Sequence, residues 1–541
     1  MSYFTGLAAA WVVLSPFLQT AAGQRFRVDD PICCEPAPLN IDNLEFRRIN
    51  EFYDYYRNTF QHPGESNEHA SPPIPAQNVN TLGEVLNSAW YTNRKLTHEQ
   101  IVRGPNDPAR APDASGPWTV IAAKTEGVTP GLLIRDAGGR RYLLKFDPLR
   151  NPEMATGADV ITAKLLYAIG YFVPENYLVH FSREQLVVGR DTKFTDQFAR
   201  TSNITDRDVT ELLLRVPRAR RGPHEGKIRA VASLYVPGQP IGPFKYYGRR
   251  KGDRNDFIRH EHRRELRGFR VISAWVNHHD SRSINTLDTV VEEHGVRHVR
   301  HYLIDFGSTL GSAATKSKSA REGNAPLFDF RSAAANFASL GLYFRHWEIA
   351  KYSYYPSVGR IQYSAFDPER WVPNYHNRAF MNALPEDKFW AAKKIMQFSD
   401  ADIREVVASG EYSDKGAENW VAECLIRRRD IIGRTYVRQA AALDNFRVAD
   451  GRLTFDDLAA RYGFGGQEEI RIAWARFDNE SGAKSDLTSA TTLQLPEPLR
   501  TAAAGTYWAT TIKREGDERS VTIYIRKSAA GYEIAGVERM W

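Results

Sequence analysis

The order of strand-like and helix-like segments after residue 117 constrains the fold of this chain more than any other feature of its sequence. Short strands are predicted at 118–124, 131–136 and 141–146, where apolar runs alternate with glycine-containing turns. A helix is predicted next, because apolar residues recur at helical spacing over 158–169 and Gly170 follows them. A strand at 228–236, a helix at 263–275 and a strand pair at 287–292 and 296–304 follow, and helical patterns dominate 332–442. We therefore expect an α+β core over residues 118–445, strand-rich first and helical second.

Sequence of a different texture flanks this core on both sides. Residues 24–117 are rich in proline, asparagine and aromatic residues, and we predict an N-terminal extension that wraps the core, with a helix at 44–60. In the tail, Val521, Ile523 and Ile525 alternate with polar residues, which indicates strands. We predict a small, separable β-rich module over 446–541. The length of 541 residues and the ordinary globular composition accommodate about two to four such units.

The first 23 residues are typical of an export signal. Residues 7–18 are almost unbroken apolar sequence, and Ala21, Ala22 and Gly23 supply the small residues that signal peptidase accepts. We predict cleavage before Gln24 and export to a periplasmic, extracellular or secretory-lumen location. No lysine or arginine precedes Arg25, so an uncleaved anchor is the alternative, although a dozen apolar residues fall short of the roughly 20 that span a bilayer. No later segment is apolar enough to span one.

Cysteine content and charge bound the class of protein further. The three cysteines, Cys33, Cys34 and Cys424, are too few for a disulfide-framed scaffold, and either one of the adjacent pair bridges to Cys424 or all three stay reduced. The net charge of +7 favours anionic partners. The basic runs at 215–227 and 249–254 have few aromatic neighbours, so we predict solvated surfaces and expect no nucleic-acid partner.

Four polar residues stand at positions suited to phosphoryl transfer. Lys145 ends the third predicted strand, Asp280 and Asn285 lie five residues apart in the segment 277–285, and Asp305 follows the strand at 296–304 and precedes Phe306-Gly307. Phosphoryl transfer requires mainly that a protein hold metal ions, phosphates and an acceptor hydroxyl in line. Carboxylate and amide oxygens bind Mg²⁺, and a lysine binds phosphate.

These motifs, in this order, resemble the atypical branches of the protein-kinase-like superfamily, such as HipA-type, phosphoinositide and secretory-pathway kinases, over roughly residues 118–420. The resemblance implies a bilobal core that binds Mg²⁺ and ATP or another nucleoside triphosphate. It implies that Asp280 accepts or orients the acceptor proton, that Asn285 and Asp305 bind metal, and that Lys145 pairs with the phosphates.

The resemblance also implies an acidic partner for Lys145 and a glycine-containing turn over the phosphates. We favour Asp159 as the partner, with Glu153 as the alternative; the family more often has glutamate there. The turn at 125–131 contains Gly127 and Gly131, whose backbone N–H groups would face the phosphates, but it lacks the G-x-G-x-x-G pattern of conventional kinases.

Two functional hypotheses follow. The first is an exported kinase-like phosphotransferase acting on an unknown acceptor hydroxyl, and the second is a catalytically silent kinase-like protein that binds an anionic surface partner. The four polar residues together favour the first, whereas aspartate at 159 and the irregular glycine turn favour the second. Other chemistries have less support: no G-x-S-x-G motif is present, and His260, His262, His298 and His301 have spacings that indicate core or solvated side chains, not metal ligands.

Overall fold

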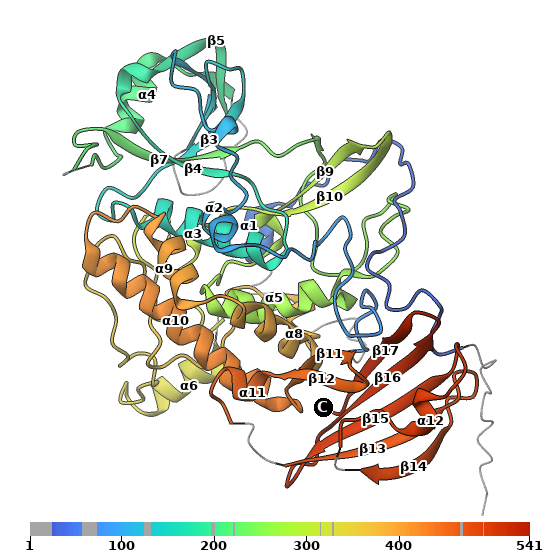
Figure 1. The fold of residues 1–541 in the computed structure, drawn as a ribbon. Helices are drawn as coiled ribbons and strands as arrows, with labels where there is room; N and C mark the ends of the chain where they lie inside the picture. The colour runs from blue at the N-terminus through green and yellow to red at the C-terminus, as the bar shows by residue number, and fades with distance from the viewer. Residues whose placement is uncertain are drawn as a thin grey trace, which may run out of the picture.

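The computed structural model describes residues 24–56, 73–123, 131–195, 201–219, 222–313, 315–326, 329–465, 469–490 and 492–541 (Figure 1). The predicted export signal at residues 1–23 lies outside the described residues. The fold is mixed α+β, with a large sheet, a group of helices and a second, C-terminal sheet. Among the described residues, no helix is both long and apolar enough to cross a membrane.

The large sheet has seven strands in the order β4-β7-β3-β2-β1-β5-β6. The strands are β1 (Trp118–Ala123), β2 (Gly131–Arg135), β3 (Arg141–Lys145), β4 (Asn176–Phe181), β5 (Leu186–Thr195), β6 (Thr201–Asn203) and β7 (Ile228–Leu234). The three strands predicted at 118–146 and the later strand at 228–236 are confirmed, within one or two residues. Alternate residues of β1, β2 and β3 bury one apolar face, which includes Val120, Ile134 and Leu144.

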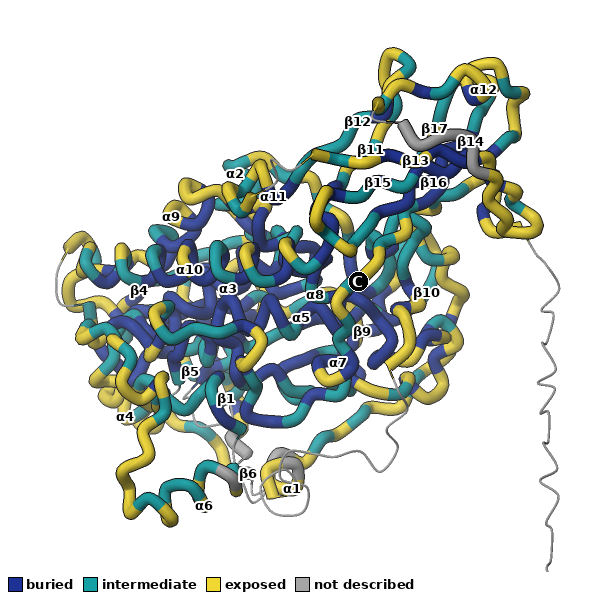
Figure 2. The backbone as a smooth tube through the Cα atoms, turned by 90° about the horizontal axis from the view of Figure 1, so that it is seen from below, coloured by how far each residue is buried: buried dark blue, intermediate teal, exposed yellow. Residues whose placement is uncertain are grey.

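Helix α3 (Met154–Ile169) connects β3 to β4 and ends as the sequence predicts. Nearly all of its residues are buried, because the helix lies between the sheet and the helical part of the chain (Figure 2). Gly170 caps it with a φ of 136°, and a Cβ at this position would overlap the ring of Tyr91. The close approach of Tyr91 and the positive φ together require glycine here.

The strands β8 (Gln239–Pro240), β9 (Thr286–Glu293) and β10 (Val296–Leu303) form a short sheet. Helix α5 (Arg264–Trp275) lies between β8 and β9 in the chain. Strands β9 and β10 form the predicted antiparallel pair. His294 and Gly295 at its turn have φ values of 50° and 76°, as a tight two-residue hairpin turn requires.

The helical part is built from helices that surround one large apolar core. Besides α5, they are α2 (His98–Arg103), α7 (Arg378–Met381), α8 (Pro385–Met396), α9 (Asp400–Ala408) and α10 (Lys415–Tyr436). Helix α6 (Phe330–Ala338) does not belong to this core, and its Phe330 and Phe337 side chains are exposed. Helices do dominate the second half of 332–442, where helical patterns were expected to prevail, but residues 339–377 are irregular. Pro356, Pro368 and Pro373 interrupt this stretch, and Ile361 and Trp371 pack it against the core without helix formation.

The N-terminal extension runs along the short sheet. The helix predicted at 44–60 begins only at Glu51, as α1 (Glu51–Tyr56), and residues 57–60 lie outside the described part of the chain. Before it, the N–H of Ile41 donates to the Arg297 carbonyl at 3.0 Å and that of Arg47 to the Ile241 carbonyl at 3.0 Å. The extended segment thus follows the edge of the short sheet.

The C-terminal part contains a five-stranded sheet in the order β14-β13-β15-β16-β17. Its elements are β11 (Leu443–Ala449), β12 (Arg452–Asp457), α11 (Leu458–Arg461), β13 (Ile470–Phe477), β14 (Lys484–Ala490), α12 (Glu497–Arg500), β15 (Tyr507–Arg514), β16 (Ser520–Ser528) and β17 (Gly531–Arg539). The sheet has its own apolar core, which includes Trp474, Trp508 and Ile523. However, Leu458 packs into the core of the helical part, and the Trp541 ring lies 5.5 Å from that of Phe389. Separability of this module stays a prediction.

Phe26 joins the N-terminal extension to the second face of this sheet. It is 4% exposed and packs with Phe477, Tyr507 and Tyr524, with ring centroids 4.9 Å apart for the Tyr524 pair. The Asn479 side chain accepts a hydrogen bond from the Phe26 N–H at 2.8 Å and donates one to its carbonyl at 2.8 Å. The sequence gives no sign of this contact, since its partners lie more than 450 residues away.

The substitution Phe26→Ala is therefore expected to destabilise the C-terminal sheet by about 3 kcal/mol, because it removes a buried aromatic ring and leaves a cavity. Hydrogen–deuterium exchange, resolved by mass spectrometry, should become faster in β15 and β16. Phe52→Ala is the matched control, because that ring is 81% exposed. Equal exchange rates in the two variants would show that the Phe26 ring does not stabilise the sheet.

The cysteines adopt a state that the sequence did not indicate. Cys33 and Cys34 form a disulfide with each other, and Cys424 is buried and free. The bridge to Cys424 that we considered is therefore absent, because Cys33 and Cys34 are bonded to each other. Burial raises the pKa of Cys424 to about 12, so this thiol stays protonated at neutral pH.

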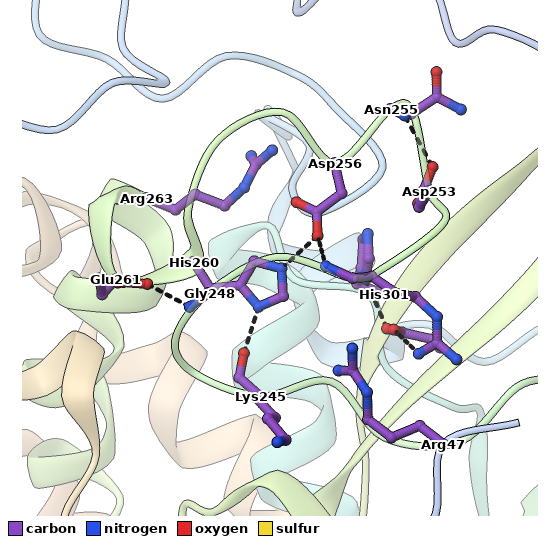
Figure 3. A network of polar contacts seen from close by, with 12 residues as sticks. Arg47, Lys245, Gly248, Asp253, Asn255, Asp256, His260, Glu261, Arg263 and His301 are labelled. Carbon is purple, nitrogen blue, oxygen red and sulfur yellow. Dashed lines mark hydrogen bonds and ion pairs between the residues drawn. The ribbon is translucent and has the colours of Figure 1, made fainter. Parts of the chain in front are cut away.

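A buried polar network links the basic run at 249–254 to the short sheet (Figure 3). Asp288 accepts from Arg250 at 2.7 Å and pairs with the His301 ring at 2.7 Å, while His260 contacts Asp256 at 2.8 Å. These histidines are core side chains, as the sequence predicts. The run itself is only partly the solvated surface that we expected, because Arg250 is 3% exposed and compensates the buried carboxylate of Asp288.

Candidate functional site

Lys145, Asp159 and Asp305 come together from three separate elements. Lys145 is the last residue of β3, Asp159 lies in the first half of α3, and Asp305 follows β10. The Lys145 ammonium lies 2.8 Å from Asp159 Oδ2 and 3.1 Å from Asp305 Oδ1. The predicted pair between Lys145 and Asp159 is thus present. Asp159 is 1% exposed and the Asp305 side chain is 37% exposed, so the second carboxylate is the one that faces solvent.

The alternative partner of Lys145 points elsewhere. Glu153 lies at the N-cap of α3 with a φ of 68°, and its carboxylate accepts from the backbone N–H of Ser413 at 2.9 Å. Helical geometry explains the choice, because Asp159 is one and a half turns into the helix and lies level with the end of β3. Asp159 therefore takes the position expected of the acidic partner.

Asp280 and Asn285 form the second half of the site. The Asn285 side-chain N–H groups donate to the Asp280 carbonyl at 2.7 Å and to Asp280 Oδ2 at 3.0 Å. The five-residue spacing predicted from the sequence therefore closes a loop between the two side chains. Because the amide nitrogen makes both bonds, the amide oxygen of Asn285 is left as the acceptor atom for a cation.

The two halves meet through the backbone next to Asp305. The N–H of Ile304 donates to the Asn285 carbonyl at 3.0 Å, which places Asn285 beside the end of β10. Asp305 then adopts a left-handed conformation, with φ of 63° and ψ of 68°, and Phe306 is fully buried behind it. A non-glycine residue at positive φ costs free energy, and such strain clusters at functional sites.

The charges of the first half are strongly coupled. Burial lowers the pKa of Lys145, but the carboxylates of Asp159 and Asp305 outweigh it and raise this pKa well above its usual value, so the ammonium is charged at all physiological pH. Burial raises the pKa of Asp159, Lys145 lowers it and Asp305 raises it further. One ammonium thus contacts two carboxylates, and it compensates the burial of Asp159.

His278 lies near both halves of the site. Burial lowers its pKa to about 4, and the carboxylates of Asp280 and Asp305 both oppose that shift. Its ring lies 6.2 Å from that of Phe306. The imidazole is therefore neutral at pH 7 and serves as a packing element beneath both carboxylates, without acting as a charged group.

The predicted phosphate turn is only partly described. Residues 124–130, which include Gly127, lie outside the described residues. Gly131 is the first residue of β2 and lies directly opposite Lys145 in the antiparallel ladder. The predicted turn is thus attached to the strand position next to the lysine.

Two further residues belong to the site but were missed in the sequence. The Asn176 side chain, at the start of β4, donates to Asp159 Oδ1 at 2.7 Å. Arg282 lies 2.9 Å from Asp280 Oδ1, and its guanidinium stacks 4.4 Å above the Tyr375 ring. Arg282 was recognisable in principle, two residues after Asp280, whereas no local pattern marks Asn176.

Asp305 and Asn285 are the residues suited to hold a magnesium ion, and Lys145 is suited to bind a phosphate. Their oxygen donors are hard ligands of the kind that Mg²⁺ prefers. The chain matches no protein-family model, and no curated protein matches it in sequence.

Proposed function

We propose that this protein is a kinase-like phosphotransferase, which transfers a phosphoryl group from a nucleoside triphosphate to an acceptor hydroxyl with the help of Mg²⁺. In this proposal the seven-stranded sheet with α3 is the N-terminal lobe of a bilobal core, and the helices around α5, α8 and α10 are the C-terminal lobe. We place its action outside the cytoplasm, in a compartment that supplies the nucleotide, on the basis of residues 1–23.

The observation that carries the proposal is the contact of Lys145 with both Asp159 and Asp305. A strand-end lysine, a helical carboxylate and a carboxylate after a hairpin converge on one point, although 160 residues separate the outer two. An isolated surface ion pair would carry little weight, but this lysine side chain is 12% exposed and has two partners. The order along the chain is also the one that the kinase resemblance requires.

The residues divide the chemical work as follows. When bound, Mg²⁺ would supply positive charge that neutralises the phosphates of the nucleotide. Asp305 and Asn285 would hold the metal, and Lys145 would bind phosphate. Asp159 holds the Lys145 ammonium, and Asn176 in turn donates to Asp159. Asp280 orients the acceptor hydroxyl and takes up its proton at Oδ, and Arg282 keeps that carboxylate turned toward the loop.

A second candidate function is a catalytically silent nucleotide-binding or anion-binding protein. The specific observation in its favour is that both carboxylate oxygens of Asp280 already have partners, Asn285 at 3.0 Å and Arg282 at 2.9 Å, within the loop itself. This candidate shares the metal and phosphate residues with the first. It differs only in having no transfer step.

Transfer itself tests the proposal. Wild-type protein incubated with Mg²⁺ and γ-labelled nucleoside triphosphate is expected to move label to water, to itself or to an offered hydroxyl compound. Asp305→Ala should abolish this movement, because the variant cannot hold the metal. Asp42→Ala, at an exposed aspartate in the N-terminal extension, is the matched control and should retain wild-type transfer. Binding of nucleotide without any movement of label would favour the silent protein.

A further inference from the structure

Among the described residues, the densest run of exposed apolar side chains lies in α6 and the irregular chain that follows it, a stretch that we call the apolar segment 330–354. Phe337 is 86% exposed and Leu340 is 92% exposed. More large side chains along the segment are mostly exposed as well: Leu342, Phe344, Ile349 and Tyr354. Soluble proteins rarely expose a contiguous apolar surface of this kind, and where they do, it marks an interaction site.

The apolar segment is held to the rest of the protein, so its exposed side chains do not belong to a frayed end. Trp347 is buried in the middle of it, and the Tyr352 hydroxyl donates to the Trp347 carbonyl at 3.0 Å. At the base of the segment, the N–H of Val372 donates to the carbonyl of Gly323 at 3.2 Å. The segment therefore turns one aromatic ring inward and presents its other large side chains to solvent.

A second group of exposed aromatic side chains lies on the same side of the molecule. Phe52 and Tyr53, on α1, are both exposed. Figure 2 shows α1 and α6 along the lower edge of the molecule, whereas the C-terminal sheet lies at the upper right. Figure 1 shows the two helices apart, with α1 near the middle and α6 at the lower left. Two separate protruding groups on one side fit a broad, flat surface better than a single peptide, which would fill one groove.

The charge of the apolar segment and its approach favours an anionic surface. Residues 315–354 contain six basic and three acidic residues, which gives a net charge of +3 with histidine neutral. Residues 44–57, around α1, contain three of each, so they neither add to this charge nor reduce it. Clusters of lysine and arginine next to exposed apolar side chains are typical of surfaces that bind anionic lipid.

Two of the three acidic residues are already engaged within the segment. Asp329 caps α6 through the backbone N–H of Ser332, and Glu348 lies 2.7 Å from Arg345. By contrast, Lys316 and Lys351 are exposed and have no ion-pair partner among the described residues. Positive charge is thus available to a partner, whereas most of the negative charge is compensated internally.

We propose that the apolar segment 330–354, together with α1, docks on the surface of a lipid bilayer that contains anionic lipid. The apolar side chains enter the boundary between headgroups and acyl chains, and the lysines stay at the level of the lipid phosphates. Tyrosine rings suit this boundary because one end is apolar and the other is polar. The docking depends only on exposed side chains and charge, so it holds whether or not the protein transfers phosphate.

Flotation of vesicles with the chain that begins at Gln24 tests the proposal, because the apolar residues 7–18 then cannot contribute. Wild type should float with vesicles of phosphatidylcholine and phosphatidylglycerol. Phe337→Ser/Leu340→Ser should weaken this binding by about 100-fold, since insertion of each side chain contributes about tenfold. Both side chains are exposed, so circular dichroism should show a folded variant.

The charged contribution is measured separately. Wild type should bind vesicles of phosphatidylcholine alone more weakly, and added salt should weaken its binding to the mixed vesicles. Lys316→Gln/Lys351→Gln should weaken binding to the mixed vesicles by about 25-fold, about fivefold for each lysine, and should leave binding to phosphatidylcholine nearly unchanged.

The matched control is Val28→Ser/Met540→Ser, which removes two exposed apolar side chains beside the C-terminal sheet and should bind like wild type. Failure of wild type to float with either kind of vesicle, or equal flotation of wild type and Phe337→Ser/Leu340→Ser, would overturn the proposal. Analytical ultracentrifugation supplies the remaining outcome. A wild-type dimer that the same double variant dissociates, without vesicle binding, would also overturn it and assign this face to a second copy of the chain.

Discussion

Replacing Asp280 with asparagine is expected to lower phosphoryl transfer by about 10²–10⁴-fold, the usual contribution of a positioned general base. Binding of Mg²⁺ and nucleotide should remain nearly unchanged, because Asp280 acts on the acceptor and the metal is held by Asn285 and Asp305. The amide also preserves the size of the side chain and can still accept from Asn285. Label transfer and equilibrium nucleotide binding, measured on the same preparation, provide the two readouts.

Comparing nucleotide binding with transfer in this variant distinguishes a catalytic from a structural role of Asp280. Equal losses of both in Asp280→Asn would assign the carboxylate a structural role in the loop with Arg282 and Asn285. Asp329→Asn would be a poor control because that aspartate caps α6. Asp42→Asn, in the exposed N-terminal extension, is the better match and should leave both readouts at the wild-type level.

Replacing Lys145 with methionine is expected to destabilise the protein by about 3–5 kcal/mol at pH 7.5, because the buried carboxylate of Asp159 loses its cation. The loss should depend on pH. Burial and Asp305 already raise the pKa of Asp159, and without Lys145 this pKa rises further above the unfolded value of about 3.9. A group whose folded-state pKa is raised stabilises below its unfolded pKa and loses that contribution as pH rises.

The penalty of Lys145→Met should therefore be smallest below the raised pKa that Asp159 has in wild type, and it should grow by about 1.4 kcal/mol per pH unit from there up to the higher pKa of Asp159 in the variant. Urea unfolding at several pH values measures it. The double variant Lys145→Met/Asp159→Asn should recover much of the stability at pH 7.5, because no buried charge remains. Lys251→Met, at an exposed lysine, is the control. A penalty independent of pH would show that Lys145 and Asp159 are not coupled as the geometry indicates.

Local patterns were sufficient for the elements that position the site. The glycine-separated strands, α3 and its end at Gly170, and the hairpin with its His294-Gly295 turn are all where the sequence indicates. Asp159, which the resemblance favoured over Glu153 as the partner of Lys145, is also the residue that contacts it. These features depend on contacts between near neighbours in the chain.

Features that depend on distant contacts were not predictable. Asn176 reaches Asp159 only because β4 returns beside α3, and Phe26 finds its pocket more than 450 residues away. Arg250 is buried because Asp288, 38 residues further on, compensates its charge, whereas a run of basic residues ordinarily indicates solvated surface. Helical patterns over 339–377 were misleading, because apolar residues in an irregular backbone can pack into the same core.

The central claim, that Lys145, Asn285 and Asp305 bind a magnesium–nucleotide complex, is tested most directly by the thermal stability of the mature chain with and without its ligands. Binding to the native state alone stabilises it by about 2.7 kcal/mol at a ligand concentration one hundred times the dissociation constant. We expect the melting temperature to rise with a nucleoside triphosphate only when Mg²⁺ is present, and the rise to disappear in Asp305→Ala. An unchanged melting temperature with every common nucleotide at millimolar concentration, with Mg²⁺ present, would contradict the account.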